Sequence, residues 1–135
     1  MIHDKLIEDA LKARELSYCP YSGFSVGAAL LCEDGTEFIG CNIENAAFGP
    51  TICAERTAIF KAVSSGKRQF QAIAIAGGKK GERPVNYAYP CGVCRQVMRE
   101  FCKEDFIIYV VKSPAEYQKT TLKELLPSSF GPENL

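Results

Sequence analysis

The sequence predicts an α/β fold, a three-layer α/β/α sandwich built on a mixed sheet of about five strands. Two observations lead to this prediction. Helical periodicity alternates with short strand-like runs along the chain, and the 135 residues include 47% hydrophobic and 24% charged residues, the usual mixture of a folded globular protein. The length suits one domain over residues 1–135, and no linker or internal repeat divides it.

The first half of the chain predicts a helix followed by a hairpin. Apolar residues recur at three- and four-residue steps over about 2–16, which indicates an amphipathic helix. A Cys-Pro-Tyr-Ser-Gly segment at 19–23 ends it. The apolar run 25–32 predicts a strand buried on both faces. An Asp-Gly turn follows, so the run 36–44 is predicted to be the returning strand.

The second half alternates helices and strands. Gly66 is predicted to end the first of these helices, and Thr121 with Glu124 forms a capping-box pattern for a last helical turn. The segment 77–90, rich in Gly, Lys, Pro and Tyr, is predicted to be a long loop. The other predicted elements are a helix over 53–65, a strand over 70–76, a helix over 91–103, a strand over 106–111 and an edge strand over 116–120.

Charge and composition exclude several functions. The 16 basic and 16 acidic residues give a net charge of 0, whereas proteins that hold a phosphate backbone usually carry a basic excess. A small, neutral ligand is therefore favoured over nucleic acid. No run approaches the roughly 20 apolar residues of a membrane span. The N-terminus does not resemble a secretory signal, and seven cysteines are an odd number, so we expect a cytoplasmic protein with reduced thiols or a metal site.

The chain has one histidine, His3. Its position beside the N-terminus predicts a solvent-exposed side chain. Nucleophilic catalysis by a serine–histidine or cysteine–histidine pair would have no other imidazole available. We therefore do not expect a hydrolase of those classes.

Two short motifs concentrate the chemistry, and both lie where a loop becomes a helix. One is Cys53-Ala54-Glu55-Arg56, and the other is Pro90-Cys91-Gly92-Val93-Cys94. Thiols at helix N-termini have lowered pKa values, and three thiolates plus one water would complete a tetrahedral catalytic zinc site. Glu55 could then move protons as a general acid–base. Arg56 could donate hydrogen bonds to the sulfurs and offset their negative charge.

Other interpretations of these cysteines remain open at this point. The Cys91/Cys94 pair alone also suits a thiol redox protein, which would leave Cys53 and Glu55 unexplained. A structural zinc module would need a fourth protein ligand. The remaining cysteines are candidates for it, but each is better explained as buried packing; they are Cys19, Cys32, Cys41 and Cys102.

From about residue 5 to 135, the sequence resembles the small, single-domain cytidine deaminases that act on free nucleosides. The resemblance is carried by ordered segments, which read YS from Tyr21, FSVGAAL from Phe24, GCNIENA from Gly40, CAERTA from Cys53, PCGVCRQV from Pro90 and ELLP from Glu124. It implies one Zn²⁺ per chain on Cys53, Cys91 and Cys94. The implied reaction, part of pyrimidine salvage, deaminates cytidine and 2′-deoxycytidine to uridine and 2′-deoxyuridine with release of ammonia. Zinc-activated hydroxide would attack C4 while Glu55 shuttles protons.

The resemblance also implies a substrate site. Phe24 would pack against the base, Asn42 and Glu44 would hold the ribose 3′-hydroxyl, and the backbone N–H of Ala54 would meet the pyrimidine O2. A homotetramer is implied, in which Phe130 reaches a neighbouring subunit's site, so that active sites lie near subunit interfaces.

Two features depart from the family pattern. Phe48 stands where many relatives have Tyr, and the loop before Pro90 is longer than in most relatives and carries Tyr87 and Tyr89. A deaminase of aminonucleoside antibiotics, such as a blasticidin deaminase, has a similar zinc motif and is the alternative substrate class. Asn42, Glu44 and the Phe24 segment favour a plain nucleoside.

Overall fold

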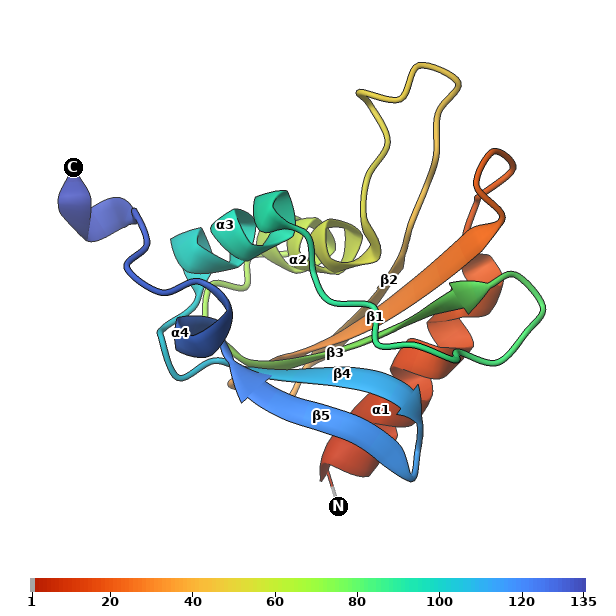
Figure 1. Ribbon diagram of the computed structural model, residues 1–135. Coiled ribbons are helices and arrows are strands. Elements are labelled where there is room, and N and C mark those ends of the chain that lie inside the picture. The colour runs from red at the N-terminus through yellow and green to blue at the C-terminus, as the bar shows by residue number, and fades with distance from the viewer. Residues whose placement is uncertain (1) are drawn as a thin grey trace.

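The computed structural model describes residues 2–135, and its centre is one five-stranded sheet with the order β2-β1-β3-β4-β5 (Figure 1). Strand β1 runs antiparallel to both of its neighbours, β3 and β4 are parallel, and β5 is antiparallel to β4. The predicted mixed, five-stranded sheet is therefore confirmed. The strands are β1 (Phe24–Cys32), β2 (Glu37–Cys41), β3 (Phe70–Lys79), β4 (Ile107–Ser113) and β5 (Glu116–Thr121).

Helices cover both faces of this sheet, which makes the predicted three layers. Helix α1 lies on one face, and α2 and α3 lie side by side on the other (Figure 1). The first predicted helix ends in a 3₁₀ turn, as its last three residues tighten. The helical elements are α1 (Ile2–Ala13), η1 (Arg14–Leu16), α2 (Ala54–Ser64), α3 (Gly92–Phe101), α4 (Leu122–Leu125) and η2 (Pro132–Asn134).

The sheet divides the hydrophobic core into two clusters. Successive side chains of a strand point to opposite faces, so Leu30 packs under α2 and α3 while Leu31 packs under α1. Both are almost fully buried, which confirms that the first strand is buried on both faces. Each such side chain contributes roughly 1.5–3 kcal/mol through its removal from water.

Two glycines let the helices approach the sheet backbone closely. A Cβ atom at Gly27 of β1 would lie 2.1 Å from the carbonyl oxygen of Ala10 in α1. On the opposite face, a Cβ at Gly40 of β2 would lie 2.5 Å from the carbonyl oxygen of Ala54 and 2.5 Å from the amide of Ala58. Gly40 thereby fixes the first turn of α2 against the sheet, and that turn carries the Cys53–Arg56 motif.

The returning strand of the hairpin is shorter than predicted. It ends at Cys41 rather than Glu44. Asn42 keeps one backbone bond to β1, from its amide to the Val26 carbonyl, and adds two through its side chain. Ile43 instead makes isolated bridges with Tyr18 and Ile52. The strand β3 extends three residues beyond its predicted end, to Lys79.

The expectation that His3 is exposed is wrong. Its side chain is 21% exposed and stacks on Tyr109, with ring centroids 5.7 Å apart. Its Nε2 lies 3.4 Å from the hydroxyl of Tyr117. Helix α1 places it on the opposite face of the sheet from α2 and α3, so the imidazole does not join the cysteine motifs.

No helix among residues 2–135 has the length and apolar character needed to span a membrane.

Candidate metal centre and substrate site

Helices α2 and α3, which lie above the sheet in Figure 1, each have a cysteine as N-cap. Cys53 is the N-cap of α2 and Cys91 is the N-cap of α3, and both have extended backbone conformations. Neither makes the side-chain hydrogen bond that an Ser, Thr, Asp or Asn cap would give. Cys94 follows in the first turn of α3. The two helix starts therefore present thiols where capping side chains usually stand.

The three sulfurs converge on one point. The Sγ atoms of Cys53 and Cys91 lie 3.8 Å apart, those of Cys91 and Cys94 lie 3.5 Å apart, and all three lie within 4.8 Å of one another. These separations exclude disulfides, in which the sulfurs are about 2.05 Å apart. Tetrahedral zinc with Zn–S bonds of about 2.3 Å holds its sulfurs about 3.8 Å apart. The donor set therefore fits three corners of a zinc site.

The thiols influence one another's ionisation. Hydrogen bonding with Cys94, and then with Arg56, outweighs burial and lowers the pKa of the Cys53 thiol to about 5. The same interaction and burial raise the pKa of Cys94. Arg56 Nη2 donates to Cys53 Sγ over 3.4 Å. Cys53 thus becomes a thiolate, the form that binds metal, more readily than Cys94.

Glu55 lies in the first turn of α2, and only 4% of its surface is exposed. Burial raises the pKa of its carboxyl to about 7, and the charge of the Cys53 thiol adds to the rise. A group with a pKa near the operating pH is well suited to both accept and release a proton. The sequence-predicted proton carrier is therefore buried next to the cluster with suitable acidity.

Arg95 is a positioning residue that the sequence analysis missed. Its Nε donates to the carbonyl of Pro90 over 2.7 Å, and its Nη1 donates to the carbonyl of Leu125 over 2.6 Å. It thereby ties the turn that carries Cys91 to the end of α4. The sequence could have pointed to Arg95, because it directly follows Cys94, the last residue of the second motif.

Asn42 lies just beyond the end of β2 and bonds to the backbone of β1. Its Oδ1 accepts from the amide of Val26 over 2.9 Å, and its Nδ2 donates to the carbonyl of Phe24 over 2.8 Å. An amide side chain has two donors and two acceptor lone pairs. One donor and one lone pair therefore stay available for a ligand.

Glu44 holds the segment that precedes β1. Its Oε1 accepts from the amides of Tyr21 and Ser22 over 3.0 and 3.1 Å, and its Oε2 accepts from the Ser22 hydroxyl. These bonds lower the pKa of Glu44, with the Ser22 hydroxyl as the largest cause. Ser22 Oγ in turn accepts from the amide of Phe24 over 3.0 Å. Asn42 and Glu44 therefore both bond to the segment that presents Phe24.

Phe24, at the start of β1, is 41% exposed. A Cβ at Gly77 of β3 would lie 3.0 Å from the Phe24 ring and 2.8 Å from the side chain of Ala88. The long loop after β3 thus passes beside this ring. Ala54 is fully buried, and as the first residue of α2 its N–H has no acceptor within the helix.

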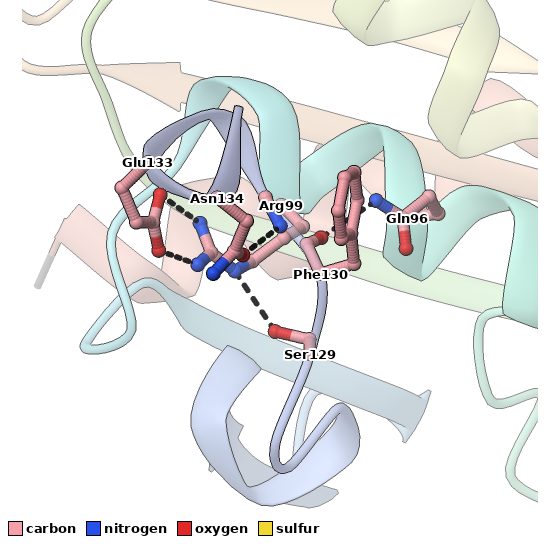
Figure 2. A network of polar contacts seen from close by, with 7 residues as sticks. Gln96, Arg99, Ser129, Phe130, Glu133 and Asn134 are labelled. Atoms are coloured by element: carbon pink, nitrogen blue, oxygen red, sulfur yellow. Dashed lines mark hydrogen bonds and ion pairs between the residues drawn. The ribbon is translucent and has the colours of Figure 1, made fainter.

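Phe130 lies in the C-terminal segment, which is tied to α3 (Figure 2). Gln96 Nε2 donates to the carbonyl of Phe130 over 2.9 Å, and Arg99 bonds to the hydroxyl of Ser129 and the carboxylate of Glu133. The backbone at Phe130 is therefore fixed while its side chain is 59% exposed. Phe48 lies in the loop between β2 and α2 and is 82% exposed.

The remaining cysteines do not join the cluster. Cys19, Cys32 and Cys102 are buried and Cys41 is half-buried, as expected of packing residues. Among residues 2–135, the group that could hold a metal therefore has three protein ligands, without the fourth that a structural zinc module needs. A thiol redox pair needs only Cys91 and Cys94, so it would not require the sulfur of Cys53 within 3.8 Å of that of Cys91. The arrangement defines a mononuclear metal site with an open position, typical of catalytic zinc.

Comparisons with known proteins agree with this class. Residues 1–110 match the family model described as the cytidine and deoxycytidylate deaminase zinc-binding region. The chain is 52% identical to a cytidine deaminase of Sporosarcina psychrophila, over 98% of this chain and 93% of that protein. It is 50% identical to one of Halalkalibacterium halodurans, over 100% and 98%. A solved cytidine deaminase of Burkholderia pseudomallei matches with a TM-score of 0.87 and 45% identity, over 96% and 100%.

The chain belongs to the cytidine and deoxycytidylate deaminase family. Zinc is accordingly the metal for which Cys53, Cys91 and Cys94 are placed.

Proposed function

We propose that the protein deaminates cytidine and 2′-deoxycytidine hydrolytically, giving uridine or 2′-deoxyuridine and ammonia. The observation that carries this proposal is the convergence of three thiols at two helix starts with the buried carboxyl of Glu55 in the same turn as Cys53. Family membership and about 50% identity to proteins named cytidine deaminase support the substrate.

The zinc ion would be held by Cys53, Cys91 and Cys94. When bound, zinc lowers the pKa of water at its open position to about 7 and so supplies hydroxide at neutral pH. Glu55 takes the proton released there and delivers it to N3 of the cytosine ring as the oxygen adds at C4. It then takes the proton of the hydroxyl group now on C4 and delivers it to the amino group. The C4–N bond breaks, ammonia leaves, and C4 becomes the carbonyl carbon of uridine.

Other residues would bind and orient the nucleoside. Phe24 offers an exposed ring for the base, and the free N–H of Ala54 would donate to the pyrimidine O2. Asn42 and Glu44 would hold the 3′-hydroxyl, which both cytidine and 2′-deoxycytidine carry. Because their existing bonds hold the segment before Phe24, sugar contacts and base contacts would be positioned together.

The test is ultraviolet absorbance of cytidine incubated with purified protein, before and after removal of zinc. Conversion to uridine that disappears on stripping and returns with added zinc is the expected result. A protein that holds one zinc per chain but leaves cytidine unchanged would exclude this substrate and favour another aminopyrimidine nucleoside. A protein that binds no zinc would exclude the proposed centre.

We further infer a homotetramer in the cytoplasm, with active sites near subunit interfaces. Exposed apolar side chains on α2 and α3 support an interface: Phe60 is 45% and Val93 is 57% exposed, and both line a hollow of about 530 Å³ with Phe101. Mixing Glu55→Gln and Phe130→Ala subunits tests shared sites. If Phe130 acts in a neighbour's site, mixed assemblies recover activity that neither variant has alone; no recovery would place Phe130 in its own subunit's site or outside any site.

A further inference from the structure

A hollow lies away from the cysteine cluster, on the α1 side of the sheet. It has a volume of about 550 Å³. Four parts of the chain line it: the end of α1 with η1 (residues 11–15), Ser25 of β1, the start of the long loop (80–84) and the end of β4 with the residue after it (112–114). Figure 1 shows the end of α1 and this loop at the same end of the sheet.

Arg14 is a fixed cation in the wall of this hollow. Its Nε donates to the carbonyl of Ser25 over 3.0 Å, and its Nη2 donates to the carbonyl of Lys79 over 3.0 Å. A guanidinium has five N–H groups, so three remain unused. Among residues 2–135 no carboxylate forms an ion pair with it. Arg14 is therefore a half-buried, oriented positive charge without a counter-ion.

Gly78 brings the loop onto this guanidinium. A Cβ at Gly78 would lie 3.1 Å from Arg14 Nη2 and 3.0 Å from the Cα of Pro84. Loop residues 80–84 are therefore held close to Arg14 across β3. The other end of the loop is also anchored, because the amino group of Lys112 lies 4.6 Å from the centre of the Tyr87 ring and the Tyr89 hydroxyl donates to Gln118 over 2.5 Å.

The loop adds two cations that have no partner. Within residues 2–135, the side chains of Lys80 and Arg83 make no hydrogen bond or ion pair, although both line the hollow. With Arg14 and Lys112, the lining holds four cations and two carboxylates, on a chain whose net charge is 0. Lys112 is ion-paired with Glu116 over 3.5 Å, outside the lining, so in the described chain the three cations without an ion pair are Arg14, Lys80 and Arg83. The carboxylates are Glu15 and Glu82. Positive charge is thus gathered at one concave place.

We propose that this hollow is a second binding site, for a small molecule that carries one or more phosphate groups. An arginine fork matches phosphate geometry, and lysines add point charges. The volume lies within the range of roughly 300–1,000 Å³ of small-molecule sites, which favours a phosphate ester over free phosphate. The cysteine cluster does not line this hollow, although Glu82 and Arg83 also line a smaller hollow that includes Phe24.

Isothermal titration calorimetry of the zinc-loaded protein tests the proposal, with adenosine diphosphate, pyrophosphate, inorganic phosphate and uncharged adenosine as probes. We expect one diphosphate-binding site per chain, weakened by added salt, and no binding of adenosine. Tighter binding of adenosine diphosphate than of both inorganic anions would identify a phosphate ester as the ligand. Equal binding of all three would identify the free anion.

A double variant, Lys80→Gln with Arg83→Gln, maps the site. Both side chains are exposed on the loop and unpaired, so the fold is expected to persist. Binding of the diphosphate should weaken at least about tenfold. The charge-matched control is Lys103→Gln with Lys119→Gln, whose exposed lysines lie outside the hollow. Equal weakening in both double variants, or no binding of either diphosphate at millimolar concentration to the unmodified protein, would overturn the proposal.

Discussion

The guanidinium of Arg56 lies one turn after Cys53 on α2, and its Nη2 donates to the Cys53 sulfur over 3.4 Å. Its Nε is buried and, alone among the buried side-chain nitrogens and oxygens of residues 2–135, has no hydrogen-bond partner. Leaving such a group unpaired costs about 1–3 kcal/mol. The arginine is therefore held at the sulfur at some expense of stability, as expected of a residue that serves the metal centre rather than the fold.

Arg56→Gln should weaken zinc binding roughly 10–100-fold, the usual effect of losing a partner that bonds to a metal ligand. Three thiolates would give the zinc site a net negative charge, and glutamine cannot offset it. Competition with a chromophoric chelator measures the affinity. The control is Lys61→Gln, which removes an exposed cation from the same helix. If both variants retain zinc like the unmodified protein, Arg56 has no role at the centre.

Cys94→Ala should abolish stoichiometric zinc binding, because two thiols cannot hold the ion as three can. Cys94 is fully buried, so folding must be checked by circular dichroism. Cys41→Ala is the matched control, since Cys41 is a half-buried free thiol outside the cluster. Zinc content is measured by atomic emission. A folded Cys94→Ala protein with one zinc per chain would contradict the ligand assignment.

Glu55→Gln should keep zinc and lose turnover by a factor of about 10² to 10⁴, the usual contribution of a general acid–base. Glutamine has nearly the shape of glutamate but cannot carry a proton. The initial rate of cytidine loss and the zinc content are measured on the same sample. Glu8→Gln, an exposed change on α1 across the sheet from the cluster, is a suitable control. Turnover within a few-fold of the unmodified rate would remove Glu55 from the proton transfers.

Local patterns were sufficient to predict most of the fold. Period-two and period-3.6 hydrophobicity located the strands and helices, and Gly66, with a φ of 92°, ends α2 as predicted. The end of β2 could not be predicted this way. Ile43 continues the alternation, but whether it pairs with β1 depends on the Asn42 side chain and on Tyr18, which is distant in sequence.

In the candidate site, too, local patterns predicted some features, while others depend on tertiary contacts. Residue type and spacing identified the three thiols and Glu55, since metal chemistry allows few alternatives. The tertiary bonds that position them could not be predicted from spacing: Arg95 reaches Leu125, and Glu44 reaches Ser22. His3 was misjudged for a related reason, because only the packing of α1 on β4 and β5 brings it between two tyrosines.

Stability should respond to pH through the carboxyl pair of Asp9 on α1 and Glu37 on β2. Burial, and then a hydrogen bond with Asp9, raises the pKa of Glu37 above its usual 4.5. Lys5 contacts both carboxylates, over 2.6 and 3.2 Å. Because the pKa of Glu37 is higher in the folded protein than in the unfolded chain, protonated Glu37 stabilises the fold. This contribution is complete below about pH 4.5 and is lost as the pH rises through the folded-state pKa.

Glu37→Gln should keep this stability at high pH, because the glutamine amide can donate a hydrogen bond to Asp9 at every pH. We expect the variant to melt about 1–3 °C above the unmodified protein at pH 8, a gain of roughly 0.5 kcal/mol, with the difference vanishing near pH 4. Thermal unfolding followed by circular dichroism measures it. Glu8→Gln, an exposed change on α1, controls for net charge. A difference that does not depend on pH would exclude the carboxyl pair as its source.

The last prediction concerns the C-terminal segment. A Cβ at Gly131 would lie 2.3 Å from Cζ of Arg99, whose guanidinium is held by Ser129 and Glu133 (Figure 2). Gly131→Ala should therefore push the Arg99 guanidinium away from Ser129 and Glu133, which loosens the segment that carries Phe130. Because the segment is peripheral, we expect a loss of no more than about 1–3 kcal/mol in unfolding free energy.

If Phe130 contacts substrate, Gly131→Ala should lower kcat/KM for cytidine by about as much as Phe130→Ala, and combining the two changes should add little, because both remove the same contact. Pro132→Ala is the control, since it changes the adjacent, exposed residue without a clash. Initial rates at several cytidine concentrations measure each variant. Full additivity of the two changes would show that Gly131 acts other than through Phe130. An unchanged kcat/KM in Phe130→Ala would remove the phenylalanine from the substrate site.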